Sequence, residues 1–184
     1  MTRKTRVDWL EEGIEVLATQ GSDSLTIDRL AERLGVTKGS FYHHFRGQAE
    51  YRDSLLEHWY GAMAPIADVP RAPDEALAAL DRLVGSLPVG TEYRDPGMAI
   101  RYWATRDPGV RDFIRRIDGE RVAYAEGLLA VIVVDPDRAQ SLARFLYALV
   151  IGAGHILPPM EHEALLDLYG EFKRLLPGAE PAGL

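Results

Sequence analysis

Residues 37–43, TKGSFYH, place in one short segment the side chains that a DNA-reading helix uses. Such a helix needs a small residue where its backbone meets the duplex, donors for phosphate oxygens, and side chains for base edges. Gly39 could fill the first role and His43 the last. Residues 35–49 contain no Asp or Glu, so this segment carries no charge that repels phosphate. The candidate phosphate donors are Thr37, Lys38, Ser40 and Tyr42.

Two short helices must position these side chains. The segment before them has apolar residues at the i, i+3, i+4 and i+7 spacing of one buried helix face, and Thr26 stands where a hydroxyl can cap the first N–H groups. Gly35 falls where a left-handed residue ends a helix, and Thr37 can cap a second helix that begins at Lys38. A tight glycine turn between two helices makes a helix-turn-helix. The apolar positions of the first helix are Ile27, Leu30, Ala31 and Leu34.

The second helix is predicted to have an aromatic inner face and a polar outer face. Phe41 and Phe45 are four residues apart and turn inward, whereas Lys38 and Tyr42, also four apart, turn outward. Helix pairs of this kind also occur in domains that bind no nucleic acid. The outer face therefore either contacts DNA or is the solvated surface of a three-helix core.

The run GVTKGSFYHHF followed by GQAEYRDSLLEHWY resembles the TetR family of bacterial transcriptional regulators, across residues 6–60. The glycine turn, the Lys-Gly-Ser triplet, the aromatic residue and the terminal Phe carry the resemblance. It implies a repressor that a small-molecule effector releases, a homodimer, and a palindromic double-stranded DNA operator. The DNA-binding residues predicted on this basis are Thr26, Thr37, Lys38, Gly39, Ser40, Tyr42, His43, Arg46 and Gln48.

One position departs from the family pattern. Family members commonly have a lysine at the start of the fourth helix, where it reaches a phosphate, and Gln48 stands at that place. Arg46, two residues earlier, could supply the charge. A phosphate contact from Gln48 would then rest on its amide or its backbone N–H.

The first helix is predicted to support the helix pair and to bury one apolar stripe. It follows a basic arm that contains Arg3, Lys4 and Arg6. This arm is either a disordered tail or a segment that reaches the adjacent minor groove. The predicted stripe consists of Val7, Leu10, Ile14 and Leu17.

The whole chain is predicted to be all-α, with an N-terminal three-helix DNA-binding head and a C-terminal helical ligand-binding and dimerisation domain. Residues 1–47 form the head, residues 48–64 a connecting helix, and residues 65–184 the second domain, because three prolines between residues 65 and 73 mark a break. The predicted helices are 6–20, 27–34, a short one from 38, 48–64, 73–87, 98–105, 108–132, 137–157 and 161–176.

Composition limits the classes of function. The 184-residue chain is 47% hydrophobic and 27% charged, as globular proteins are, and it has no cysteine for disulfides, thiol redox sensing or thiolate metal sites. Its net charge of −7 argues at first against a DNA partner. The placement of charge matters more, and Lys38 and Arg46 flank the second helix. We therefore expect modest non-specific DNA binding with a small salt slope.

Other kinds of site are not expected. Adjacent His43 and His44 cannot both face one metal on a helix, and His162 lacks a second histidine at the spacing of a zinc protease. Glycine-rich phosphate loops and nucleophile elbows are absent from the sequence, so we expect no metal, no cofactor and no enzymatic activity. The N-terminus lacks an apolar signal region and the most apolar stretch is interrupted by Arg144, which favours a cytoplasmic protein without a membrane partner.

Aromatic, sulfur and imidazole side chains recur on the helices that line a cavity in TetR family members. Core packing is the alternative for each of them. A mostly apolar effector cavity with a few polar groups is the expected kind. The predicted ligand-pocket residues are Met63, Met98, Tyr102, Trp103, Phe113, Tyr124, Phe145 and His155.

The last two helices are predicted to form a four-helix dimer interface with the same helices of a second copy. Glycines at 152 and 154 would let another helix approach closely, and the final helix has one apolar face. The alternative is that both helices only complete the monomer core. The predicted dimer-interface residues are Leu149, Gly152, Leu165, Leu168 and Phe172.

A ligand-responsive regulator is the leading hypothesis. The competing one is an interaction protein that keeps the TetR fold but has lost sequence-specific DNA binding, which the acidic balance and Gln48 favour. An enzyme on a helical fold has no supporting constellation of residues.

Overall fold

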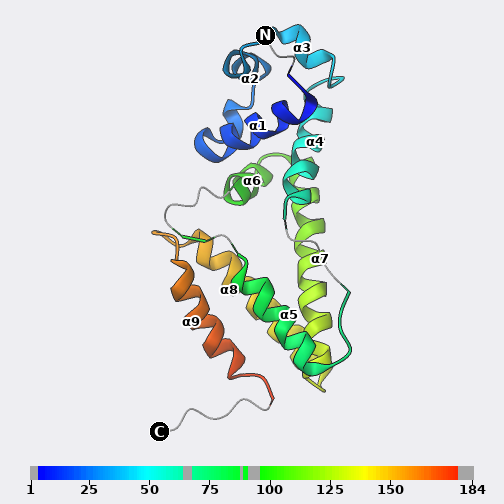
Figure 1. Cartoon of the computed structure of the whole chain (residues 1–184), viewed down its shortest axis with the longest axis vertical. Helices are drawn as coiled ribbons and strands as arrows, with labels where there is room; N and C mark the ends of the chain where they lie inside the picture. The colour runs from blue at the N-terminus through cyan, green and yellow to red at the C-terminus, as the bar shows by residue number, and fades with distance from the viewer. Residues whose placement is uncertain (1–3, 64–67, 88, 91–95, 178–184) are drawn as a thin grey trace. The chain divides into compact units, whose positions relative to one another are not determined.

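The computed structural model describes residues 4–63, 68–87, 89–90 and 96–177, and helices joined by turns make up these ranges (Figure 1). The predicted all-α fold is confirmed. No helix in the described ranges is long and apolar enough to cross a membrane. In chain order the elements are α1 (Arg6–Gln20), the 3-10 turn η1 (Ser22–Ser24), α2 (Ile27–Leu34), α3 (Lys38–Tyr42), α4 (Gln48–Gly61), α5 (Pro73–Gly85), α6 (Pro96–Ala104), α7 (Pro108–Ile132), α8 (Pro136–His155) and α9 (His162–Lys173).

Contacts divide the chain into two compact units, which we call the head unit and the second unit. The head unit comprises residues 1–65 and 94–114, and the second unit comprises residues 66–93 and 115–184. Helix α6 and the first turns of α7 therefore pack with the N-terminal helices, although they follow the predicted break in the sequence. The predicted division into functional domains at residue 65 stays a prediction.

Helix α1 begins with a capping box and packs against α2, α4 and α6. The Thr5 hydroxyl accepts a hydrogen bond from the Asp8 N–H (3.2 Å), and the Asp8 carboxylate accepts one from the Thr5 N–H (2.6 Å). Trp9 is fully buried, whereas Val7, which was predicted to be inside, is 48% exposed. The prediction for Val7 is wrong because the larger indole of Trp9 takes the inward position, against Phe41.

The helix-turn-helix has the predicted glycine turn. Thr26 caps α2, since its hydroxyl accepts a hydrogen bond from the Arg29 N–H (3.3 Å). Gly35 has a left-handed backbone (φ 66°, ψ 36°), which only glycine adopts without steric cost. Thr37 has the extended backbone of an N-cap, but its side chain makes no capping hydrogen bond, so that part of the prediction is wrong.

Two ion pairs join the residues after α6 to the N-terminal helices of the head unit. Arg106 pairs with Asp23 of η1 (3.2 Å), and Arg52 of α4 pairs with Asp107 (3.3 Å). Ile100 and Val110 are fully buried in the same apolar core as α1.

Asp107 also caps α7. Its carboxylate accepts hydrogen bonds from the N–H groups of Gly109 (2.8 Å) and Val110 (3.1 Å). Desolvation acts to raise the pKa of Asp107, but these backbone donors and Arg52 outweigh it and hold the pKa below its usual value. The carboxylate is therefore ionised at neutral pH.

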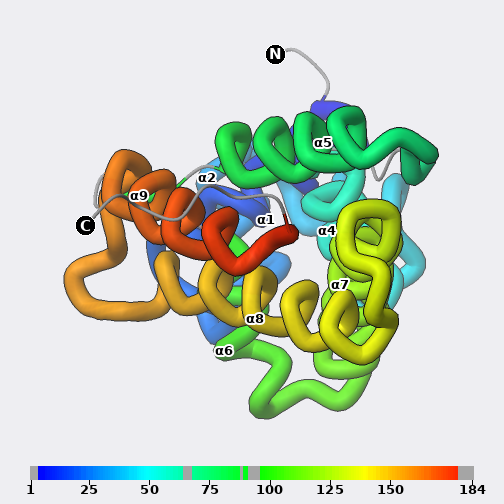
Figure 2. Tube along the Cα trace, turned by 90° about the horizontal axis from the view of Figure 1, so that it is seen from below, coloured from blue at the N-terminus to red at the C-terminus, as the bar shows by residue number. Residues whose placement is uncertain are grey.

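The second unit is built from α5, α8, α9 and residues 115–132 of α7. Helix α9 packs side by side with α8 and also contacts α5 (Figure 2). Lys173 pairs with Asp81 of α5 (3.0 Å), and the Tyr147 hydroxyl donates a hydrogen bond to Asp118 of α7 (2.7 Å). Its fully buried core includes Leu80, Leu128, Leu129, Ala143 and Leu165.

Candidate nucleic-acid interface

Helix α3 has a buried face and an exposed face. Phe41 is fully buried, whereas the adjacent Tyr42 is 60% exposed. Lys38 and His43 are also exposed, and Ser40 is half-buried. The side chains that were predicted to turn outward therefore lie on the surface of the head unit, and their contact with DNA stays a prediction.

An aromatic cluster fixes α3 from the inside. The ring of Phe41 lies 5.4 Å from that of Trp9, 5.1 Å from that of Phe45 and 5.5 Å from that of Tyr51. These rings come from α1, from the turn after α3 and from α4. A five-residue helix is unstable alone, so tertiary packing is what holds the outer face of α3 in place.

Lys38, the first residue of α3, pairs with an acid on the preceding helix. Its ammonium group contacts the carboxylate of Asp28, in the first turn of α2. Both side chains are about two-thirds exposed, at 64% and 67%. Water and salt therefore screen the pair, which makes it easy to exchange.

The carboxylate of Glu50, at the start of α4, contacts two arginines. Glu50 Oε2 accepts hydrogen bonds from the backbone N–H (2.9 Å) and Nε (3.1 Å) of Arg46, and Glu50 Oε1 lies 3.6 Å from Nη2 of Arg6. The backbone hydrogen bond from Arg46 is the main cause that holds the pKa of Glu50 below its usual value. Glu50 is therefore ionised at neutral pH and neutralises part of the local positive charge.

Arg6 is held by further contacts. Its Nη2 donates to the hydroxyl of Ser54 (2.6 Å), and its guanidinium lies over the ring of Phe45, 5.0 Å from the ring centre. The first residue of α1 is thus fixed against α4. The predicted basic arm also contains Lys4 and Arg3. The backbone carbonyl of Lys4 accepts a hydrogen bond from His44 Nε2 (3.0 Å), and Arg3 lies outside the described residues.

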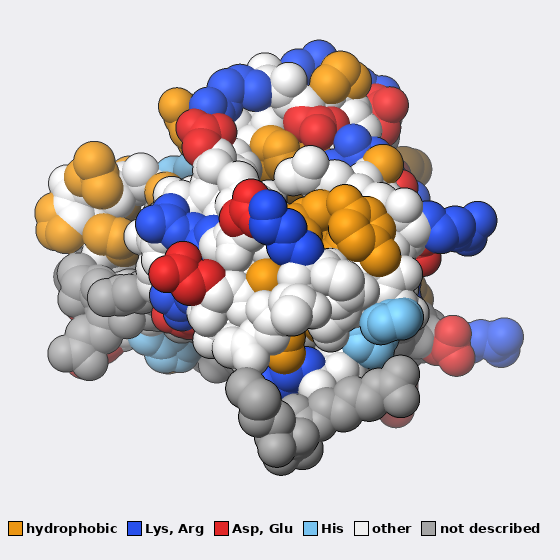
Figure 3. All heavy atoms as spheres, turned by 90° about the horizontal axis from the view of Figure 1, so that it is seen from above, with side chains coloured by type: hydrophobic (Ala, Val, Ile, Leu, Met, Phe, Trp, Pro, Cys, Tyr) orange, Lys and Arg blue, Asp and Glu red, His pale blue; other side chains and the backbone are white. Residues whose placement is uncertain are grey.

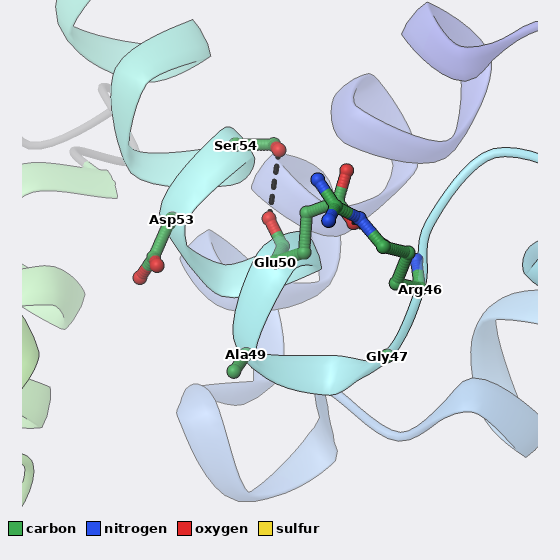
Figure 4. Close-up of a pocket in the computed structure, with 6 residues that line it drawn as sticks. All are labelled: Arg46, Gly47, Ala49, Glu50, Asp53 and Ser54. Atoms are coloured by element: carbon green, nitrogen blue, oxygen red, sulfur yellow. Dashed lines mark hydrogen bonds and ion pairs between the residues drawn. The ribbon is translucent and has the colours of Figure 1, made fainter.

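A shallow hollow of about 470 Å³ lies at the start of α4 (Figure 4). Figure 4 shows the side chain of Arg46 reaching back to Glu50, while Ser54 donates to the Glu50 carbonyl (2.7 Å). Because two carboxylates and one guanidinium line it, the hollow is not a simple cationic site for phosphate. Its lining residues are Arg46, Gly47, Ala49, Glu50, Asp53 and Ser54.

The side chain of Gln48 makes a hydrogen bond within the head unit. Its side-chain amide donates a hydrogen bond to the carbonyl of Leu25 (3.1 Å), which ties the start of α4 to the segment before α2. Gly47 has no side chain with which to cap α4. A phosphate contact through the Gln48 amide would have to share or replace this bond, which leaves the backbone N–H as the simpler donor.

Figure 3, which is seen from above relative to Figure 1, shows positive and negative side chains interspersed. Blue and red groups lie next to one another there, instead of forming one continuous basic patch. The prediction that the segment around α3 is free of acids holds for the sequence between residues 35 and 49. In the fold, Asp28 and Glu50 bring acids to its two ends.

Asp28 and Glu50 are the residues that sequence reasoning missed. The i, i+4 spacing of Arg46 and Glu50 could have indicated their pair. Asp28 is ten residues before Lys38 and meets it only because the glycine turn brings α3 against α2. Local spacing gives no signal for that contact.

The predicted ligand-pocket residues are divided between the two units. Tyr102 is 63% exposed and its ring lies under the guanidinium of Arg106, 4.6 Å away. Phe145 is half exposed and stacks on Phe172 at 6.1 Å. The effector pocket stays a prediction. Met63, Met98, Tyr102, Trp103 and Phe113 belong to the head unit, and Tyr124, Phe145 and His155 belong to the second unit.

The predicted dimer-interface residues differ in burial. Leu165 and Phe172 are buried in the core of the second unit, so their side chains are not available to a partner. These two residues therefore follow the alternative prediction, in which the helices complete the core of the monomer. Leu149 and Gly152 are half-buried and Leu168 is 40% exposed, so these three remain candidates for an interface.

A family model described as "Bacterial regulatory proteins, tetR family" matches residues 10–50. Residues 10–50 are therefore similar to the DNA-binding part of the TetR family. The matched residues run from α1 to the first turn of α4, which are the elements that present α3.

Two curated relatives are similar to part of this chain. One is the uncharacterized HTH-type transcriptional regulator TtgW of Pseudomonas putida, 35% identical over 54 residues, which are 29% of this chain and 40% of TtgW. The other is the tetracycline repressor protein class A from transposon 1721 of Escherichia coli, 38% identical over 66 residues, 36% of this chain and 30% of the repressor. The chain thus spans two fifths or less of these relatives' length.

The fold of the chain resembles that of a solved transcriptional regulator. A transcriptional regulator from Rhodococcus sp. Rha1 superposes with a TM-score of 0.68 and covers 94% of this chain and 98% of its own. The sequence identity is 22%, so this likeness concerns the fold alone.

Proposed function

We propose that this protein is a DNA-binding transcriptional regulator of the TetR family and that α3 reads the major groove. The observation that supports this most is the division of α3 into a buried Phe41 and an exposed Tyr42, with Lys38 exposed on the same helix and His43 exposed at its C-cap. Lys38, Ser40 and Tyr42 suit phosphate oxygens, whereas His43 can reach base edges. The regular packing beneath α3 supplies the rigidity that such readout needs.

The regulator acts as a homodimer on a palindromic operator in this proposal, because two-fold proteins bind two-fold sites. The exposed Leu168 on α9 and the name of one relative, a tetracycline repressor, support a dimeric repressor. A small-molecule effector would release it by favouring a state in which the two copies of α3 no longer match successive major grooves.

The test is a binding assay with the full chain on the intergenic DNA beside its gene. Affinity is measured against a random duplex of the same length, over salt from about 50 to 200 mM. We expect the intergenic DNA to bind at least about a thousand-fold more tightly than the random duplex. Equal affinity for both duplexes at every salt concentration would refute the proposal.

The second candidate is an interaction protein with a TetR fold and no operator. The pairing of Lys38 with Asp28 and of Arg46 with Glu50 favours it, because paired cations attract phosphate less strongly. The same assay separates the two candidates. The interaction protein would bind both duplexes equally weakly.

A further inference from the structure

The two cations that flank the outer face of α3 are both held by carboxylates of the same unit. Lys38 contacts Asp28, and Arg46 donates to Glu50 through both its backbone N–H and its Nε. Glu50 also faces Arg6 at 3.6 Å. The acids thus stand next to Lys38, which the proposed function assigns to phosphate, and next to Arg46, for which the sequence predicts the same role.

We propose that Asp28 and Glu50 compete with DNA phosphate for these cations and thereby weaken binding that does not depend on sequence. The inference rests on the proposed function, because it assumes that phosphate approaches the α3 face. A phosphate oxygen that takes Lys38 or Arg46 must displace a carboxylate and then lies beside its negative charge. Each acid therefore lowers the affinity of the protein for any DNA duplex.

The exposure of the groups makes this exchange feasible. Arg46 is 93% exposed against 33% for its partner Glu50, and Lys38 and Asp28 are about two-thirds exposed, so both cations are open to solvent. Exposed pairs are held weakly and are screened by salt, and a strong anion can replace the carboxylate. DNA binding that does not depend on sequence comes almost wholly from phosphate contacts. The two acids should therefore lower this sequence-independent affinity most directly.

Neutral substitutions can separate charge from structure at both acids. Glu50→Gln keeps an oxygen that can accept the hydrogen bond from the Arg46 N–H, and Asp28→Asn keeps the size of a side chain in the first turn of α2. A matched control is Glu32→Gln, which removes the same charge from the same helix as Asp28. Glu32 is exposed and one turn after Asp28, and the described contacts give it no cationic partner.

The experiment measures binding of the full chain to a labelled duplex of random sequence, by fluorescence anisotropy over a salt series. We expect each of Asp28→Asn and Glu50→Gln to tighten binding by about two- to five-fold at low salt, the range that weak exposed pairs allow. The slope of log affinity against log salt should steepen by up to about 0.9 for each substitution, since one more cation is released to phosphate. Glu32→Gln should change the affinity clearly less than Asp28→Asn.

A double-mutant comparison tests whether Asp28 acts through Lys38. In a Lys38→Ala background, Asp28→Asn should have no more effect than Glu32→Gln. Unchanged affinity in both single variants, an equal gain in Glu32→Gln, or a full gain without Lys38 would each overturn the inference. Thermal unfolding of every variant confirms that the compared chains are folded.

A second readout separates this inference from the proposed function. Heparin is a polyanion without base sequence, and the salt at which each variant elutes from it reports phosphate-like binding alone. Later elution of Asp28→Asn and Glu50→Gln than of the wild-type chain supports the inference even if no operator is found. Operator binding by the wild-type chain without any shift in the variants would refute the inference and leave the proposed function intact.

Discussion

The Tyr51 hydroxyl donates a hydrogen bond to the backbone carbonyl of Trp9, 2.8 Å away, and this joins α4 to α1. Burial of the Tyr51 side chain raises its pKa, so the hydroxyl keeps its proton at physiological pH. The contact is possible because α1 has a glycine at position 13. A Cβ at Gly13 would lie 2.0 Å from the Tyr51 oxygen and 2.9 Å from Leu55.

Gly13→Ala should therefore destabilise the head unit by about 1–3 kcal/mol, the usual cost of overpacking a core. The free energy of unfolding is measured in urea with tryptophan fluorescence. Gly119→Ala on α7 is the matched control, because nothing lies within 4 Å of a Cβ there. It should be neutral or stabilise by up to about 1 kcal/mol. An unchanged stability of Gly13→Ala would contradict the described approach of α4 to α1.

Gly39→Ala should separate folding from DNA binding. A Cβ at Gly39 would meet only the Thr37 hydroxyl at 3.6 Å, an ordinary contact, so the variant should be at least as stable as the wild-type chain. If the backbone of α3 approaches the duplex at this residue, affinity for the operator should fall about tenfold, or 1.4 kcal/mol. The measurement is operator binding alongside thermal unfolding. Unchanged operator affinity would remove Gly39 from the DNA-binding residues.

Asp107 should make the head unit less stable in acid. Its pKa is lower in the folded than in the unfolded chain, so its contribution is complete above the unfolded value of about 3.9 and is lost as the pH falls through the folded value. Asp107→Asn keeps a good N-cap but loses the charge facing Arg52. At neutral pH the variant should be less stable by up to about 1 kcal/mol.

The difference in stability between the wild-type chain and Asp107→Asn should shrink as the pH falls below about 4, because the unfolded chain takes up the Asp107 proton there and the folded chain takes it up only at lower pH. Urea unfolding at a series of pH values follows this difference. A difference that is the same at every pH would show that the charge of Asp107 adds nothing to the cap.

Leu168→Glu should weaken the proposed homodimer by about 2 kcal/mol or more, since it buries a charge where an apolar side chain is expected. Leu168 is 40% exposed on α9, so the substitution spares the core. Val134→Glu is the control, because Val134 is 97% exposed and precedes α8. Sedimentation over a concentration series gives the dissociation constants. Equal dimerisation of both variants would place the interface away from Leu168.

The spacing of apolar residues and the residues that begin and end helices predicted the helix positions well. The predicted ranges 6–20 and 27–34 coincide with α1 and α2, because a threonine cap opens each helix and a glycine closes it. Helix α4 ends at Gly61, three residues before the predicted 64. The prediction relied on the break at Pro65, whereas the helix ends four residues earlier.

Contacts between elements were not predictable from one sequence. Apolar spacing does not say which side chain on α1 faces Phe41, and so Trp9 was missed and Val7 was wrongly placed inside. Likewise, an apolar face on α9 could cover a partner or its own core, and Leu165 turned out to lie in the core. The pairing of Lys38 with Asp28 depends on the packing of α2 and α3.

The most direct test of the central claim, that the outer face of α3 reads bases, is selection from a pool of randomised duplexes followed by sequencing. The full wild-type chain should enrich one palindromic site. His43→Ala should lose the preference at specific base pairs of each half-site while it keeps its affinity for random DNA, whereas Tyr42→Ala should weaken binding to both kinds of duplex. Enrichment of the same site by the wild-type chain and by His43→Ala, or of no site by the wild-type chain, would contradict the account.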